Sequence, residues 1–131
     1  MRKIYLERKS YIKYDEQKYA VYLNEEVVQN YVPEGEFLGN AIPVTAYSYE
    51  GTMTDGSTII DAVDASRDSL INGIIRSKFS QSEEDAIKTH QLQVLRGDID
   101  DAQKQLYDAE WGAFNEFREF AKASVDAWLD S

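Results

Sequence analysis

Hydrophobic positions in the first half of the chain follow the period of two that is typical of β-strands. Aromatic and β-branched residues, which are enriched in strands, dominate three short segments: 4–6, 11–14 and 19–23. The polar residues 15–18 between the last two segments predict a hairpin loop. Residues 42–49 alternate as a half-buried strand, with Pro43 at its start because proline cannot donate to a sheet ladder.

Two turns are predicted in the same half of the chain. The run Pro33-Glu34-Gly35 (33–35) breaks the chain into a turn or loop. Asp55-Gly56 lies between β-branched residues, which is a strong signal for a two-residue hairpin. A type I′ turn there requires positive φ at both central positions and pairs Thr54 with Ser57.

Past Ala62 the hydrophobic period changes to about three and a half residues, which indicates helices. The pattern predicts three of them, at about residues 65–79, 82–96 and 99–129. One apolar face is expected on the first helix: Leu70, Ile71, Ile74, Ile75 and Phe79. A longer stripe is expected on the third helix: Leu106, Ala113, Phe114, Phe117, Phe120, Ala121, Val125 and Trp128.

Capping residues support these three helices. Asp64 or Ser66 is a suitable N-cap for the first. Ser80 with Glu83, or a looser version with Ser82 and Asp85, predicts a capping box for the second helix. The second helix is expected to end at Gly97 in the left-handed conformation, and Asp98 is the expected cap of the third.

The order of the elements predicts an α+β protein. An N-terminal antiparallel sheet at about residues 3–61 is expected to pack against the three C-terminal helices. Neither half alone has an obvious way to bury its apolar face. We therefore predict a single domain over residues 1–131.

Composition narrows the class of protein. Hydrophobic residues make up 43% and charged residues 29%, as in soluble globular proteins. The chain has no cysteine, and no apolar run approaches the length that crosses a bilayer. A formal net charge of −10 disfavours nucleic acid and membrane surfaces as partners. The predicted location is cytoplasmic, or virion-associated if the protein comes from a phage.

Charge is segregated along the N-terminal half. Six basic residues lie within the first eighteen positions: Arg2, Lys3, Arg8, Lys9, Lys13 and Lys18. Residues 19–66 contain no lysine or arginine but several carboxylates: Glu25, Glu26, Glu34, Glu36, Glu50, Asp55, Asp61 and Asp64. Such a field steers a basic partner or aligns copies of the chain head to tail. Alternatively, adjacent strands pair basic with acidic side chains within one sheet.

We find no catalytic, cofactor-binding or metal-binding motif. His90 is the single histidine and has no accompanying nucleophile motif. Asp98, Asp100 and Asp101 lack the glycine and distant glutamate of a calcium loop and are better explained by helix capping. No spacing selects a pair of carboxylates for acid–base work. The prediction is a protein that is not an enzyme.

The second half of the chain resembles small uncharacterised proteins of gut Bacteroides and their prophages. The likeness covers roughly residues 50–125 and includes Gly51–Ile60 (51–60), Leu70-Ile71-Asn72-Gly73-Ile74-Ile75-Arg76 (70–76) and Phe117-Arg118-Glu119-Phe120-Ala121-Lys122 (117–122). More loosely, it is similar to tail-associated and tail-assembly proteins of temperate phages. The resemblance implies a small accessory protein that acts through contacts.

The leading hypothesis is a non-enzymatic interaction or accessory protein that binds another protein or a second copy of itself. The alternative is an acidic inhibitor that mimics nucleic acid and blocks a basic protein, and a carboxylate-based hydrolase comes third. The predicted contact surface consists of four carboxylates and two tyrosines: Glu25, Glu26, Glu34, Glu36, Tyr47 and Tyr49. Tyrosines are enriched in protein interfaces.

Overall fold

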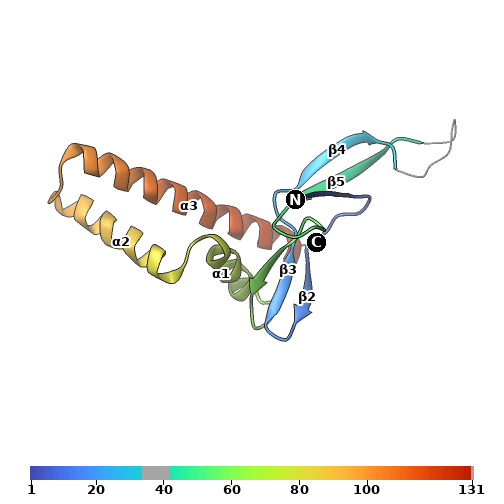
Figure 1. Ribbon diagram of the computed structural model, residues 1–131, viewed down its shortest axis with the longest axis horizontal. Helices are drawn as coiled ribbons and strands as arrows, with labels where there is room; N and C mark the ends of the chain where they lie inside the picture. The colour runs from blue at the N-terminus through green and yellow to red at the C-terminus, as the bar shows by residue number, and fades with distance from the viewer. Residues whose placement is uncertain (34–41, 131) are drawn as a thin grey trace. The chain divides into compact units, whose positions relative to one another are not determined.

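The computed structural model describes residues 1–33 and 42–130, and its strands precede its helices as an α+β fold requires (Figure 1). The α+β prediction is confirmed. The chain divides into two compact units, Met1–Ile60 and a second that begins at Asp61. The prediction of a single domain over both stays a prediction. The predicted turn at 33–35 and the carboxylates Glu34 and Glu36 fall in or beside residues 34–41, which lie outside the described residues.

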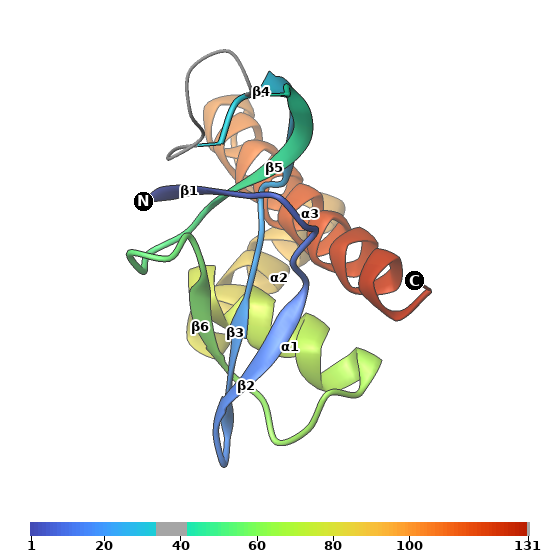
Figure 2. The ribbon, with the colours of Figure 1, turned by 90° about the vertical axis from the view of Figure 1, so that its right-hand side faces the viewer.

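The first unit consists of two three-stranded antiparallel sheets, ordered β1-β5-β4 and β2-β3-β6. The strands are β1 (Arg2–Tyr5), β2 (Tyr11–Asp15), β3 (Lys18–Val21), β4 (Glu26–Tyr31), β5 (Val44–Glu50) and β6 (Thr58–Asp61). Strand β5 is central in its sheet and β3 in the other, and Figure 2 shows β2, β3 and β6 side by side.

The predicted hairpin of β2 and β3 is confirmed. Tyr11 pairs with Val21 and Lys13 with Tyr19, and the register shifts before Asp15. Residues Tyr19 to Val21 of β3 are buried, as expected of a central strand, whereas most of β2 is exposed at the sheet edge.

Strand β4 was not predicted, because its first residue follows a run of carboxylates that reads as a loop. It pairs with β5, placing Glu26 opposite Ser48 and Val28 opposite Ala46. Between Val28 and Tyr31 the register shifts, and Asn30 in that interval has a φ of 55°. Asparagine adopts the left-handed conformation at a lower energetic cost than most residues, so it is suited to a β-bulge at this position.

The turn at Asp55-Gly56 differs from the prediction. Gly56 has a φ of 81°, but Asp55 is not in the left-handed region, so the type I′ turn is wrong. The Gly56 N–H donates to the Met53 carbonyl and the Met53 N–H donates to the Ser57 carbonyl, which makes a three-residue loop. Its strands, β5 and β6, also belong to different sheets. The Asp55 side chain determines this geometry, because its Oδ1 accepts from the Ser57 N–H (3.0 Å) and hydroxyl (2.5 Å).

The second unit contains the three predicted helices, α1 (Arg67–Lys78), α2 (Gln81–Arg96) and α3 (Asp101–Leu129). Ser66 caps α1, Ser80 and Glu83 form the predicted capping box of α2, and Gly97 ends α2 with a φ of 73°. One cap is corrected. Asp100, not Asp98, accepts from the Gln103 N–H at the start of α3.

The core of the second unit follows the predicted faces only in part. Buried side chains include Leu70, Ile71, Ile74 and Ile75 of α1, Ile87 of α2, and Phe114, Ala121 and Val125 of α3. The predicted stripe extends too far toward the start of α3, since Leu106 is 70% exposed and Ala113 is exposed. Figure 1 shows why: the first half of α3 has α2 alongside it, and a single neighbour covers a narrow stripe of a helix.

Candidate functional site

Four polar side chains from three strands share one face of the β1-β5-β4 sheet. Arg2 of β1 is opposite Glu50, and Glu26 of β4 is opposite Ser48. Ser48 and Glu50 are two residues apart on β5, and residues at that spacing point to the same side of a strand. We call this side the pocket face.

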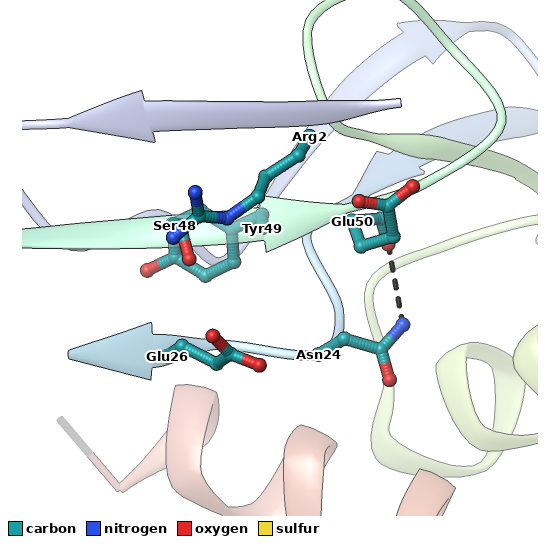
Figure 3. A pocket seen from close by; sticks show the side chains of 6 residues that line it. All are labelled: Arg2, Asn24, Glu26, Ser48, Tyr49 and Glu50. Atoms are coloured by element: carbon teal, nitrogen blue, oxygen red, sulfur yellow. Dashed lines mark hydrogen bonds between the residues drawn. The ribbon is translucent and has the colours of Figure 1, made fainter. Parts of the chain in front are cut away.

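A shallow pocket of about 250 Å³ lies on the pocket face (Figure 3). Its lining residues are Arg2, Asn24, Glu26, Ser48, Tyr49 and Glu50. In Figure 3 the Arg2 side chain extends from β1 toward Ser48 on the central strand, and Glu26 lies on the other flank, on β4. The amide nitrogen of Asn24 donates to the Glu50 carbonyl over 3.2 Å and holds the rim of the pocket.

Of the three charged side chains that line this pocket, only Glu50 has an ion-pair partner in the described chain. The Glu50 carboxylate forms an ion pair with the N-terminal ammonium at 3.0 Å, and more than half of its side chain is exposed. Within residues 1–33 and 42–130, neither the Arg2 guanidinium nor the Glu26 carboxylate forms a hydrogen bond or an ion pair. Two opposite charges on opposite walls are therefore without a partner in this part of the chain.

Ser48 lies between them and is 1% exposed. Its hydroxyl has no hydrogen-bond partner among the described residues. In that part of the chain, no polar side-chain atom is both fully enclosed and unpaired. The Ser48 hydroxyl is therefore not completely enclosed, but with 1% of the residue exposed it reaches the pocket only at its floor.

The opposite face of the same sheet carries a tyrosine cluster. The rings of Tyr5, Tyr22 and Tyr49 contact one another with centroids 5.6–6.3 Å apart. The Tyr49 hydroxyl donates to Glu25 Oε1 over 2.7 Å and accepts from the Lys9 N–H over 2.9 Å. This cluster is the polar end of the first unit's core.

Two phenols of the cluster have shifted acidities. Burial, followed by the hydrogen bond to Glu25, raises the pKa of Tyr49 to about 12. Burial, followed by the nearby Asp55 carboxylate, raises the pKa of Tyr22 to about 12. The hydrogen bond from the Ser57 hydroxyl lowers the pKa of Asp55. The two phenols therefore stay protonated as hydrogen-bond donors throughout the physiological range.

The predicted contact residues that the structure describes do not form one surface. Tyr49 is 1% exposed, so the prediction that it is an exposed anchor is wrong: its ring is enclosed by the cluster. Glu25 is engaged by Tyr49 and by Arg8, whose Nη2 lies 3.1 Å from its Oε2. Tyr47 is half-buried under the Arg8 guanidinium, 5.2 Å from the ring centroid. Glu26 faces the other side of the sheet.

These contacts favour the alternative that the segregated charges pair internally. Arg8, from the basic opening stretch, meets Glu25, from the stretch that lacks lysine and arginine. The pairing is incomplete, because in the described chain the Arg2 guanidinium and the Glu26 carboxylate form no ion pair.

The pocket lacks the geometry of the hydrolases we considered. It holds two carboxylates, Glu26 and Glu50, but Glu50 is exposed and already paired. A general acid of this type needs a desolvated carboxyl group. Among the described residues no base is hydrogen-bonded to Ser48, as a serine nucleophile requires. His90 lies in α2, stacked on Tyr107 with its Nδ1 3.0 Å from Glu110 Oε1, and is explained by helix pairing.

Sequence reasoning missed Arg2, Asn24 and Ser48. Ser48 and Glu50 do alternate along β5, but their neighbours depend on strands that are distant in sequence. Only the register places Arg2 and Glu26 on either side of them.

Metal, membrane and family comparisons add limits to this picture. Over the described ranges, no three His, Cys, Asp or Glu side chains gather as a metal site would need. No helix in the same ranges is long and apolar enough to cross a membrane. No family model matches the chain, and neither curated proteins nor solved structures gave a match.

Proposed function

We propose that the protein is a non-enzymatic binding protein that contacts another protein through the pocket face and its continuation along β4 and β5. The observation that carries the proposal is an apolar extension of that face. Val28, Tyr31 and Val44 follow Glu26 and Ser48 on the same side of the two strands. Val44 is 37% exposed, and Ile42 just before it is 76% exposed.

Exposed apolar side chains next to polar ones are typical of transient protein interfaces. Beside Val44, two large apolar residues directly beyond the ends of these strands are exposed: Val32 and Ile42. In addition, β4 is an edge strand of its sheet. An edge strand offers backbone donors and acceptors to an incoming strand.

A photo-crosslinking amino acid at position 44 tests the proposal in the full chain. We expect an adduct with a protein, which is lost when Ile42 is replaced by Lys. The control places the same crosslinker at Ala86, an exposed position of α2. Adducts at position 44 no stronger than those at position 86, in cells and in concentrated pure protein, would overturn the proposal.

The nucleic-acid mimic remains the second candidate because the net charge is −10 and the Glu26 carboxylate has no partner among residues 1–33 and 42–130. The two candidates respond differently to salt. Binding by mimicry falls steeply as salt rises from 50 to about 200 mM, whereas an apolar strand contact changes little. A steep salt dependence of the adduct at position 44 would favour the mimic.

The proposed setting is the cytoplasm, or a virion if the accessory role in a phage holds. Its support is the resemblance over residues 50–125 and the lack of a membrane-spanning helix in the described chain. Co-purification with assembled phage particles from an induced lysogen would test the virion setting.

A further inference from the structure

We infer that the pocket on the β1-β5-β4 sheet binds a small zwitterion of the α-amino acid class. The ligand's carboxylate would lie at Arg2 and its ammonium at Glu26, with Ser48 between them. The inference shares the pocket face with the proposed protein contact, but it is tested with glycine and with variants at Arg2 and Glu26 rather than with a crosslinker at position 44. Each can therefore fail without the other.

The spacing of the two free charges suits such a ligand. Arg2 and Glu26 are on the two strands that flank β5, and their partners on β5 are two residues apart. Strand separation and rise place their Cα atoms about 12 Å apart. In Figure 3 the two side chains lie on either side of the pocket, with the central strand β5 between the strands that carry them. The two side chains do not form an ion pair with each other.

The chemistry at each wall is matched to one end of the ligand. A guanidinium binds a carboxylate through two parallel N–H···O bonds. A carboxylate accepts hydrogen bonds from an ammonium, and the Glu26 carboxylate has no partner among the described residues. The volume of about 250 Å³ holds a small amino acid but not a nucleotide.

A ligand with a single charge would leave one wall unsatisfied. An anion such as acetate would use Arg2 and bring a negative charge toward Glu26. A cation such as methylammonium would use Glu26 and face Arg2. Discrimination against both is therefore the signature of this site.

The experiment is a titration of the full chain with glycine at constant ionic strength, followed by amide chemical shifts in NMR spectra. We expect saturable shifts at Asn24, Ser48 and Glu50 with a Kd on the order of 1–10 mM, since so small a ligand binds weakly. Acetate and methylammonium should bind at least about tenfold more weakly.

Two variants and two matched controls complete the test. Arg2→Gln and Glu26→Gln each remove the charge from one wall of the pocket and should weaken glycine binding at least about tenfold. Lys13→Gln and Glu16→Gln make the same charge changes at exposed positions away from the pocket and should bind as the unmodified chain does. The inference is overturned if glycine causes no saturable shift. Equal binding of acetate or methylammonium, or unchanged binding by the two pocket variants, would overturn it as well.

Discussion

Replacing Tyr49 with Phe isolates the contribution of one hydroxyl to the first unit. The ring stays in the cluster, so packing is retained, but two hydrogen bonds are lost: one to Glu25 at 2.7 Å and one from the Lys9 N–H at 2.9 Å. A hydrogen bond to a charged group contributes about 1.5–3 kcal/mol and one to a neutral group about 1 kcal/mol. Glu25 keeps Arg8 and some water, which returns part of the loss. We expect a fall in the free energy of unfolding of about 2 kcal/mol.

Urea unfolding followed by far-ultraviolet circular dichroism measures this effect. With a slope of about 2 kcal/mol per molar urea, the midpoint should fall by about 1 M. Tyr47→Phe is the matched control, because the Tyr47 hydroxyl has no hydrogen-bond partner in the described chain. It should change stability by less than about 0.5 kcal/mol. Equal midpoints for the two variants would refute the assignment of the Tyr49 network as a stabilising feature.

The remaining predictions concern cooperativity, a glycine and a buried carboxylate. Both tryptophans lie in α3, so tryptophan fluorescence reports on the unfolding of the second unit. Because the chain is predicted to be one domain, fluorescence and circular dichroism of the Tyr49→Phe variant should show the same unfolding transition. Separate transitions would contradict the single-domain prediction. Gly56→Ala should lower stability by more than about 1 kcal/mol, since its φ is 81° and the new methyl meets a β5 carbonyl oxygen at 2.9 Å. Gly112→Ala, in open space within α3, should raise stability by about 0.5–1 kcal/mol. A urea midpoint that is higher for Gly56→Ala than for Gly112→Ala would show that the turn geometry is wrong. Glu84→Gln should lower stability at pH 7 by about 1 kcal/mol. The hydrogen bond from Lys88 lowers the pKa of Glu84 below its ordinary 4.5, so the stability difference between the unmodified chain and the variant should shrink as the pH falls below 4.5. A stability difference that persists at low pH would count against this reasoning. An equal loss of stability in the exposed control Glu116→Gln would do so as well.

Local signals were reliable wherever the deciding contacts lie within a few residues. The capping box of Ser80 and Glu83 and the left-handed Gly97 are read from the sequence because both partners are in one turn. The helical face of α1 follows for the same reason. The third cap was misplaced by two residues, since Asp98 and Asp100 both precede the helix and offer the same side chain. The Asp55-Gly56 signal identified a turn, but its type depended on the Asp55–Ser57 hydrogen bonds and on strands that join different sheets.

The division into strands followed by helices, most helix boundaries and the segregation of charge can be read from the chain alone, because each depends on residues that are neighbours in the sequence. Three features depend on the folded structure: Tyr49 is enclosed, Glu25 meets Arg8, and Arg2, Ser48 and Glu26 share one pocket. These features follow from strand register, since a shift of one residue turns every side chain to the other face of the sheet. No local pattern specifies the register between β5 and its two neighbours, β1 and β4, because both are distant from it in the sequence.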